Sequence, residues 1–217
     1  MVNILVTGGA GFIGTAMVKR LLTLEYNVTV IDLSQKISNL KDPCKDADYL
    51  SVNIKSSKEL KRLSGARFDY IFHFAAQTSG RISQETPEVD VDTNVKGTLN
   101  MCNFARKVGN PKIIFTSSMA VYGNQDGSIL ENTSTQPRSN YGVSKLSGEL
   151  YLKMYHDFGI KSTIFRLFNV YGPGQDFRNM KQGMASIFAS QLITSGKIQV
   201  TGSLERYRDC LLYTSEL

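Results

Sequence analysis

The chain has 217 residues, of which 41% are hydrophobic and 20% are charged, and its formal net charge is +6. This composition can build a sizeable core and excludes a disordered chain, and the basic residues are too scattered for the stripe that a nucleic-acid-binding protein needs. No stretch reaches the ~20 apolar residues of a membrane span. Three cysteines without metal-ligand spacing favour a reduced, cytoplasmic protein with no bound metal.

Short apolar runs alternate with amphipathic stretches along most of the chain. We expect strands near residues 3–7, 28–33, 48–53, 69–74, 112–117 and 161–167, and helices near 12–24, 56–64, 88–108 and 141–158. Strand runs such as Ile113-Ile-Phe115 lack polar alternation, which is typical of a parallel sheet covered on both faces. The sequence therefore predicts an α/β fold with a Rossmann-type, doubly wound parallel sheet.

The alternation weakens after residue 168. A helix near 182–195 and a strand near 198–201 are expected there. We interpret residues 1–168 as a dinucleotide-binding domain and residues 169–209 as the beginning of a small C-terminal substrate lobe.

The first expected strand runs into a glycine-rich turn that opens a helix. Four glycines between residues 8 and 14 let the backbone approach a pyrophosphate, which the amides at the helix start would bind. An ordinary tight turn would also use glycines, but Asp32 follows at the end of the second strand, where its carboxylate can accept hydrogen bonds from a ribose diol. That carboxylate would repel the 2′-phosphate of NADP, so we expect NAD as the cofactor. Lys36 weakens this preference.

Two polar residues near the fourth strand have alternative interpretations. His73 ends that strand, and we favour a packed histidine over a catalytic one. Asn94 falls inside an expected helix, where it would either bridge helix and strand backbones beneath the cofactor or lie in solvent.

A tyrosine and a lysine lie four residues apart in the expected helix near 141–158. Tyr141 and Lys145 therefore share one helix face, where the ammonium can lower the pKa of the phenol. A phenol with a lowered pKa can remove a proton from an alcohol, which is the usual step before hydride removal.

These motifs together resemble the extended short-chain dehydrogenase/reductase family, and within it the NAD-dependent epimerases and dehydratases of nucleotide sugars. The resemblance covers residues 1 to about 209. It rests on Thr7-Gly-Gly-Ala-Gly-Phe-Ile-Gly14, Asp32, His73-Phe-Ala-Ala76, Asn94-Val-Lys-Gly-Thr98, Thr116-Ser-Ser-Met-Ala-Val-Tyr-Gly123, Tyr141 to Lys145, and Arg166-Leu-Phe-Asn-Val-Tyr-Gly-Pro173.

The resemblance implies a role for each matching residue. Tyr141 would be the acid/base, Lys145 would bind the nicotinamide ribose, and Ser118 would hydrogen-bond the reacting sugar oxygen, although a loop serine can also cap local backbone. Asn169 and Arg208 would contact the substrate. The implied cofactor-binding residues are Gly8, Gly11, Phe12, Ile13, Gly14, Asp32, Asn53, Ile54, Phe74, Ala75, Ala76, Asn94, Ser117, Tyr141 and Lys145.

Two departures from the family pattern bear on the activity. Dehydratases of this family carry an Asp-Glu pair after the catalytic hydroxyl, whereas this chain has Met119-Ala120, so elimination of water lacks its acid and base. Asn53 stands where many relatives have an aspartate near the adenine, but its amide oxygen can still accept a hydrogen bond from the adenine amino group.

The expected function is that of an NAD-dependent nucleotide-sugar 4-epimerase acting through a transient 4-keto intermediate, with a UDP-sugar as the first choice of substrate. Other nucleotide-sugar oxidoreductases, such as a 4-keto reductase or a decarboxylase, remain alternatives, as does a non-catalytic NAD-binding sensor. We expect a homodimer in a longer parent protein. Residues 210–217 depart from the family pattern, and we interpret them as a non-native tail on a truncated chain.

Overall fold

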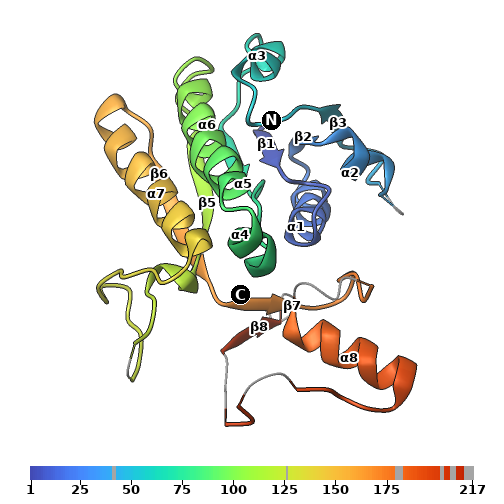
Figure 1. Ribbon diagram of the computed structural model, residues 1–217. Coiled ribbons are helices and arrows are strands. Elements are labelled where there is room, and N and C mark those ends of the chain that lie inside the picture. Colours follow the sequence, from blue (N-terminus) through green and yellow to red (C-terminus); the bar gives the residue numbers. More distant parts are fainter. Residues whose placement is uncertain (41–42, 126, 179–182, 201–202, 206–208, 213–217) are drawn as a thin grey trace.

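A six-stranded parallel sheet organises the computed structural model, which describes residues 1–40, 43–125, 127–178, 183–200, 203–205 and 209–212. The strand order is β3-β2-β1-β4-β5-β6 (Figure 1). The strands are β1 (Asn3–Thr7), β2 (Asn27–Asp32), β3 (Asp48–Ser51), β4 (Tyr70–His73), β5 (Lys112–Ser118) and β6 (Ser162–Leu167). The chain builds the sheet outward from β1 to β3 and then returns, so that β4 lies on the other side of β1. This is the doubly wound arrangement that the sequence predicts, and the fold class is confirmed.

Helices connect successive strands and cover the sheet. They are α1 (Phe12–Thr23), α2 (Ser34–Ser38), α3 (Ser57–Leu60), α4 (Gly80–Glu85), α5 (Glu88–Asp90), α6 (Gly97–Ala105) and α7 (Asn140–Tyr155). A π-helix, η2 (Val91–Lys96), joins α5 to α6, and 3₁₀ turns η1 (Lys61–Leu63), η3 (Met119–Val121) and η4 (His156–Phe158) follow α3, β5 and α7. Figure 1 shows α6 and α7 on one side of the sheet and α1 on the other.

Each face of the sheet has its own apolar core, because alternate residues of a strand point to opposite faces. On the α6 and α7 side, Leu5, Ile71 and Phe115 pack against helix residues that include Met101 and Leu152. On the α1 side the core is made by Ile4, Val6, Val28 and Val30 of the strands with Val18 and Leu21 of α1. The second face is less covered toward β6, where Phe165 is 50% exposed.

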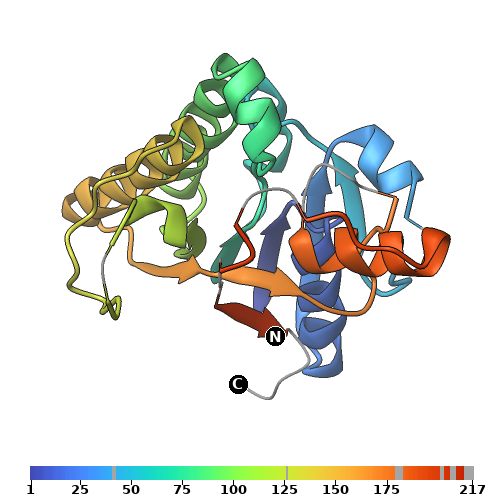
Figure 2. The ribbon, with the colours of Figure 1, turned by 60° about the horizontal axis from the view of Figure 1, so that its bottom comes forward.

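Three further elements lie at the carboxyl edge of the sheet, as both ribbon views show (Figures 1 and 2). They are β7 (Asn169–Tyr171), α8 (Met184–Ser195) and β8 (Cys210–Leu212), and β7 pairs in parallel with β8. Because β7 follows β6 almost directly, the chain after Leu167 turns across the ends of the strands where a ligand binds in this fold.

The structure corrects the sequence expectations for this last part of the chain. Residues 198–200 form no strand, although one was expected near 198–201. Ile198 and Val200 are 47% and 41% exposed, so a β-favouring sequence without a partner strand stays irregular. Conversely, Cys210–Leu212, the first residues of the segment interpreted as a tail, pair with β7 as β8.

None of the helices within the described residues is both long and apolar enough to cross a bilayer.

Candidate active site

The glycine-rich turn between β1 and α1 is shaped by close backbone contacts. Gly8 has a φ of +71°, and a Cβ there would lie 2.6 Å from the amide nitrogen of Ala75. A Cβ on Gly14 would lie 2.1 Å from the carbonyl oxygen of Gly8. Side chains at these two positions would therefore fill the turn.

The first turn of α1, which contains Phe12 and Ile13, adds an anion-binding end to this loop. Gly11 is the N-cap and has no side-chain capping hydrogen bond, and no acidic residue lies in the first turn. Since the first amides of a helix point along its axis and carry a partial positive charge, this end suits a phosphate group. The turn therefore fits the pyrophosphate of a dinucleotide.

Asp32 ends β2 beside the glycine turn. One carboxylate oxygen accepts from the amide of Ala10 at 3.1 Å and the other from the amide of Leu33 at 2.8 Å. Burial raises the pKa of Asp32, while these two hydrogen bonds and the charge of Lys36 act in the opposite direction. A carboxylate has about four acceptor positions. The two backbone hydrogen bonds hold the Asp32 side chain in place and leave acceptor positions free for the hydroxyls of a ribose.

Asn53 and Ile54 follow β3, and their side chains have different surroundings. The side-chain oxygen of Asn53 accepts from the amide of Lys55 at 3.0 Å, which leaves one lone pair for an adenine amino group. The side chain of Ile54 is buried in the core, where it contacts the position that a Cβ of Gly97 would occupy. The core therefore takes the side chain of Ile54, and the expected contact of this residue with the cofactor stays a prediction.

His73 is buried at the end of β4 and is a packing residue, as favoured from the sequence. Its ring is hydrogen-bonded to Thr7 Oγ1 at 2.7 Å and to Thr98 Oγ1 at 3.1 Å. The hydroxyl of Thr98 donates to the carbonyl of Asn94, so it can only accept from Nε2 of His73. Burial lowers the pKa of His73 to about 3, with a smaller contribution from Lys145, and the ring stays neutral.

After His73 the chain passes through Phe74, Ala75 and Ala76 at the carboxyl edge. The amides of Phe74 and Ala75 donate to the backbone and side-chain oxygens of Thr7, both at 3.1 Å. This strand end is therefore tied to β1 beside the glycine turn, where small residues leave room for a cofactor.

Asn94 bridges the loop after β4 to α7 from within the π-helix η2. Its oxygen accepts from the amide of Gln77 at 2.8 Å, and its nitrogen donates to the carbonyl of Gln77 and to Ser144 Oγ at 3.0 and 2.9 Å. Asn94 is 2% exposed, so the solvated alternative is wrong and the bridging interpretation is confirmed. Ser144 directly precedes Lys145 in α7, so the bridge from Asn94 reaches the helix turn that carries Tyr141 and Lys145.

Ser118 and Tyr141 meet where β5 ends and α7 begins. Ser118 caps the turn η3 by accepting from the amide of Ala120 at 3.2 Å, and its hydroxyl lies near enough to Tyr141 to act on the pKa of the phenol. Gly142 permits the close approach of α7, because a Cβ there would lie 2.6 Å from the carbonyl oxygen of Ala120. The local capping role of Ser118 is therefore present in the structure, and its expected hydrogen bond to the reacting sugar oxygen stays a prediction.

Lys145 is buried one helical turn after Tyr141, with an exposed fraction of 3%. Its ammonium lies 4.4 Å from the centre of the Phe115 ring, a cation–π contact. Burial lowers the pKa of Lys145 to about 7, and the negative charge of Glu149 partly opposes this effect.

One electrostatic expectation is wrong for this arrangement. Burial raises the pKa of Tyr141, with a further increase from the charge of Asp90, and the hydrogen bond from Ser118 only partly compensates. The spacing does put Lys145 on the tyrosine's face of the helix, but desolvation, which a sequence does not display, is the largest influence on the pKa of Tyr141.

The side chain of Ser117, a residue expected to contact the cofactor, has a protein partner. Its side chain is buried on the helix-covered face of the sheet, where the hydroxyl hydrogen-bonds Glu149. Since neighbouring residues of a strand point to opposite faces, Ser117 and Ser118 cannot both face the reacting groups. The hydroxyl of Ser117 is therefore engaged by Glu149, and the expected contact of this residue with the cofactor stays a prediction.

Asn169 lies at the start of β7, close to the loop that carries Ser118. Its nitrogen donates to the carbonyl of Asp209 at 3.1 Å and lies 3.9 Å from the sulfur of Met119. Its expected contact with the substrate remains a prediction. Arg208 lies outside the described residues.

Sequence reasoning did not identify the buried acids that surround these residues. Asp90 is 1% exposed and accepts from Gln77 Nε2 at 2.6 Å and from Ser83 Oγ at 2.5 Å. Glu149 is 6% exposed and pairs with Arg166. The spacing could have indicated Glu149, because it follows Lys145 by four residues, as Lys145 follows Tyr141, and so lies on the same face of α7. We recognise no sequence pattern that indicates a buried position for Asp90.

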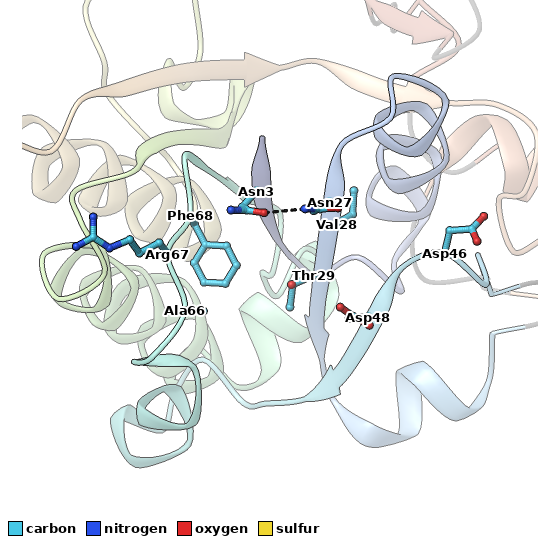
Figure 3. A pocket seen from close by; sticks show the side chains of 9 residues that line it. All are labelled: Asn3, Asn27, Val28, Thr29, Asp46, Asp48, Ala66, Arg67 and Phe68. Carbon is cyan, nitrogen blue, oxygen red and sulfur yellow. Dashed lines mark hydrogen bonds between the residues drawn. The ribbon is translucent and has the colours of Figure 1, made fainter. Parts of the chain in front are cut away.

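A hollow of about 470 Å³ lies at the opposite, amino-terminal edge of the sheet (Figure 3). Its lining includes Asn3, Asn27, Asp48 and Arg67. Asn3 and Asn27 hydrogen-bond each other at 3.0 Å, and Asp48 and Arg67 are exposed. The hollow is remote from Tyr141 and Ser118, which lie at the carboxyl edge.

Comparison with known proteins agrees with this assignment. The statistical model of one protein family, described as the NAD dependent epimerase/dehydratase family, matches residues 4–214. The chain belongs to the NAD-dependent epimerase/dehydratase family. A protein of Methanocaldococcus jannaschii that is provisionally named a UDP-glucose 4-epimerase is 37% identical over 210 residues, which are 95% of this chain and 68% of that protein.

Two solved structures of the epimerase/dehydratase type are similar along nearly the whole chain. The UDP-glucose 4-epimerase of Thermotoga maritima, solved with UDP-glucose, has a TM-score of 0.89 and 34% identity over 97% of this chain and 69% of its own. The dTDP-glucose 4,6-dehydratase DesIV of Streptomyces venezuelae, solved with NAD, has a TM-score of 0.85 and 29% identity over 97% and 68%. The chain thus spans about two thirds of these relatives, which catalyse more than one reaction.

The cofactor of this family member is NAD, and the glycine turn, the N-terminal end of α1 and Asp32 fit it. We expect NAD to bind more tightly than NADP, because Asp32 would repel a 2′-phosphate. Replacing Asp32 by asparagine should reduce the ratio of the two affinities about tenfold, the effect of about 1.4 kcal/mol of lost repulsion and hydrogen bonding.

Titration of both cofactors, followed by quenching of tyrosine fluorescence or by calorimetry, measures this ratio. Asp48→Asn, at the amino-terminal edge, is the matched control and should leave the ratio unchanged. Equal affinities of the unaltered protein for NAD and NADP would show that Lys36 outweighs Asp32.

Proposed function

We propose that this chain is an NAD-dependent nucleotide-sugar 4-epimerase that acts by transient oxidation at C4 of the sugar. The observation that carries the proposal is the grouping of Ser118, Tyr141 and Lys145 at the carboxyl edge of the sheet beside the dinucleotide turn, with Ser118 near enough to lower the pKa of Tyr141 and Lys145 one helical turn away. A non-catalytic sensor of NAD would not need these three groups.

Tyr141 and Ser118 have different roles in the proposed reaction. Tyr141 takes the proton of the sugar 4-hydroxyl, and Ser118 holds the same oxygen by a hydrogen bond. When bound, oxidised NAD supplies a hydride acceptor and a positive charge that favours the phenolate of Tyr141. Because burial raises the pKa of Tyr141, loss of its proton depends on such positive charges, to which Lys145 adds its own.

Epimerisation then requires two steps that restore the starting balance of atoms. The 4-keto sugar would turn over in the site, Tyr141 would give the proton back to the same oxygen, and NAD, when bound, would supply to the opposite face of C4 the hydride that it had accepted. The sugar is inverted at one carbon, and there is no net oxidation.

The residues after Ser118 support epimerisation over dehydration. Met119 and Ala120 can neither donate nor accept a proton, so elimination of water from the sugar has no acid or base at this position. Met119 instead contacts Asn169. We therefore place the substrate between the η3 turn and β7, with Asn169 and Arg208 as candidate contacts to a nucleotide diphosphate.

A UDP-sugar is the substrate that we propose first. Incubation of the protein with NAD and UDP-glucose, UDP-N-acetylglucosamine, UDP-glucuronate or dTDP-glucose, followed by anion-exchange separation and NMR, tests it. We expect the C4 epimer of one of these sugars. A 4-keto-6-deoxy product would indicate a dehydratase, and a shortened sugar would indicate a decarboxylase.

We also propose that the protein is a cytoplasmic homodimer. Its three cysteines carry free thiols, which suits a reducing compartment. Val143, Leu150, Met154 and Phe158 form an apolar stripe along the outer face of α7 and η4, and each is between 47% and 59% exposed. Such a stripe on a helix is typical of an interface between subunits, and sedimentation velocity measures the association.

A further inference from the structure

Glu149 holds three elements together at the carboxyl edge of the sheet. Its carboxylate accepts from Arg166 of β6 in a bidentate pair, with distances of 3.0 Å from Nε to Oε1 and 2.7 Å from Nη2 to Oε2. The same carboxylate binds the hydroxyl of Ser117 of β5. Bidentate, charge-assisted pairs fix orientation as well as distance, so this group sets how α7 lies against the ends of β5 and β6.

The anchor points of this network adjoin the reacting groups. Ser117 precedes Ser118, and Glu149 follows Lys145 by four residues and Tyr141 by eight, so the three lie on one face of α7. Between them, Gly148 permits close packing, because a Cβ there would lie 2.8 Å from the Phe115 ring. A rotation of α7 that broke the Glu149 contacts would also separate Tyr141 from Ser118.

Glu149 also supplies charge to a buried region. Lys145 is 3% exposed and rests on the Phe115 ring, where water does not solvate its ammonium. The negative charge of Glu149 raises the pKa of Lys145 against the larger opposite effect of burial. The titratable and charged groups around this face of α7 are His73 of β4, Asp90 of α5, Tyr141 and Glu149 of α7, and Arg166 of β6.

These groups do not contribute equally to the balance of charge. His73 is neutral because burial lowers its pKa to about 3, and Asp90 acts on Tyr141, whose pKa it raises. Arg166 is paired with Glu149. Glu149 is thus the acid that favours the ammonium form of Lys145.

We propose that Glu149 is a positioning residue of the active site, which fixes α7 through Ser117 and Arg166 and provides the negative charge that balances Lys145. The proposal rests on the proposed function, in which Tyr141 and Lys145 act together. It predicts that the charge of Glu149, and not only its packing, is required.

The test uses Glu149→Gln, which keeps the size of the side chain and removes its charge. The titration of Lys145 is followed by NMR of ¹³Cε-lysine protein, with Lys145→Arg to assign the signal. We expect the titration midpoint to fall by about one pH unit, the usual effect of one close charge, and the alkaline limb of kcat/KM to move to lower pH by the same amount. An unchanged midpoint in folded Glu149→Gln protein would overturn the proposal.

Two controls separate charge from packing. Glu149→Asp keeps the charge, so it should lower kcat through geometry while the titration midpoint stays in place. Glu85→Gln removes one carboxylate from the exposed Arg81–Glu85 pair and should change neither quantity. A shift of equal size in Glu85→Gln would show a non-specific effect of net charge and would contradict the proposal.

A second variant covers the case in which Glu149→Gln does not fold. Arg166→Met removes the cation that neutralises Glu149, so the midpoint of Lys145 should rise, opposite in sign to the first result. No rise would count against the proposal. Absence of turnover in the unaltered protein would refute the proposed function, whereas the NMR titration would still decide the role of Glu149.

Discussion

Turnover of a nucleotide sugar should fall at least ~100-fold when Tyr141 is replaced by phenylalanine, the usual scale for loss of a positioned acid/base. The ring that packs at the start of α7 is kept, and only the hydroxyl, on whose pKa Ser118 acts, is lost. Affinity for NAD should change no more than a few-fold. Steady-state rates and a cofactor titration on the same preparations measure both quantities.

The matched control for this change is Tyr70→Phe. Tyr70 begins β4 at the amino-terminal edge of the sheet and is 39% exposed, so the same chemical change there should leave turnover unchanged. Near-normal turnover of the Tyr141→Phe protein would remove Tyr141 from the mechanism.

The second large effect is expected at Gly14. An alanine Cβ would lie 2.1 Å from the carbonyl oxygen of Gly8 and 2.7 Å from Cα of Gly9, so the glycine turn would have to move. We expect NAD affinity to fall at least tenfold and the free energy of unfolding to fall by about 1–3 kcal/mol, the cost of overpacking.

Cofactor titration and urea unfolding measure these two losses for Gly14→Ala. Gly65→Ala is the control, because a Cβ there has no atom within 4 Å, and it should alter neither quantity. If Gly14→Ala bound NAD as tightly as the unaltered protein, the turn would not be the pyrophosphate site.

The sheet was predictable because its strands carry short, nearly continuous apolar runs that are buried on at least one face. All six strands of the main sheet lie within a few residues of their expected ranges. The glycine turn was equally predictable, since close backbone approach leaves a direct signature in the sequence. In contrast, β7 and β8 are three residues long and depend on each other for pairing, so no local pattern marks them.

Side-chain direction and burial were harder to predict at the active site. Periodicity placed Tyr141 and Lys145 on one helix face, but it did not reveal that burial raises the pKa of Tyr141 and lowers that of Lys145 to about 7. Strand alternation and core packing give the side chains of Ser117 and Ile54 protein partners, which the sequence did not reveal, while their expected cofactor contacts stay predictions. These outcomes depend on neighbours distant in sequence.

The central proposal is transient oxidation at C4, and the fate of the hydrogen on that carbon tests it most directly. The protein is incubated with NAD and UDP-glucose deuterated at C4, in ordinary water, and the product is analysed by NMR and mass spectrometry. If hydride leaves and returns within one active site, the product is the C4 epimer with its deuterium retained at C4. Loss of the deuterium to water, or a product altered at a carbon other than C4, would contradict the proposed mechanism.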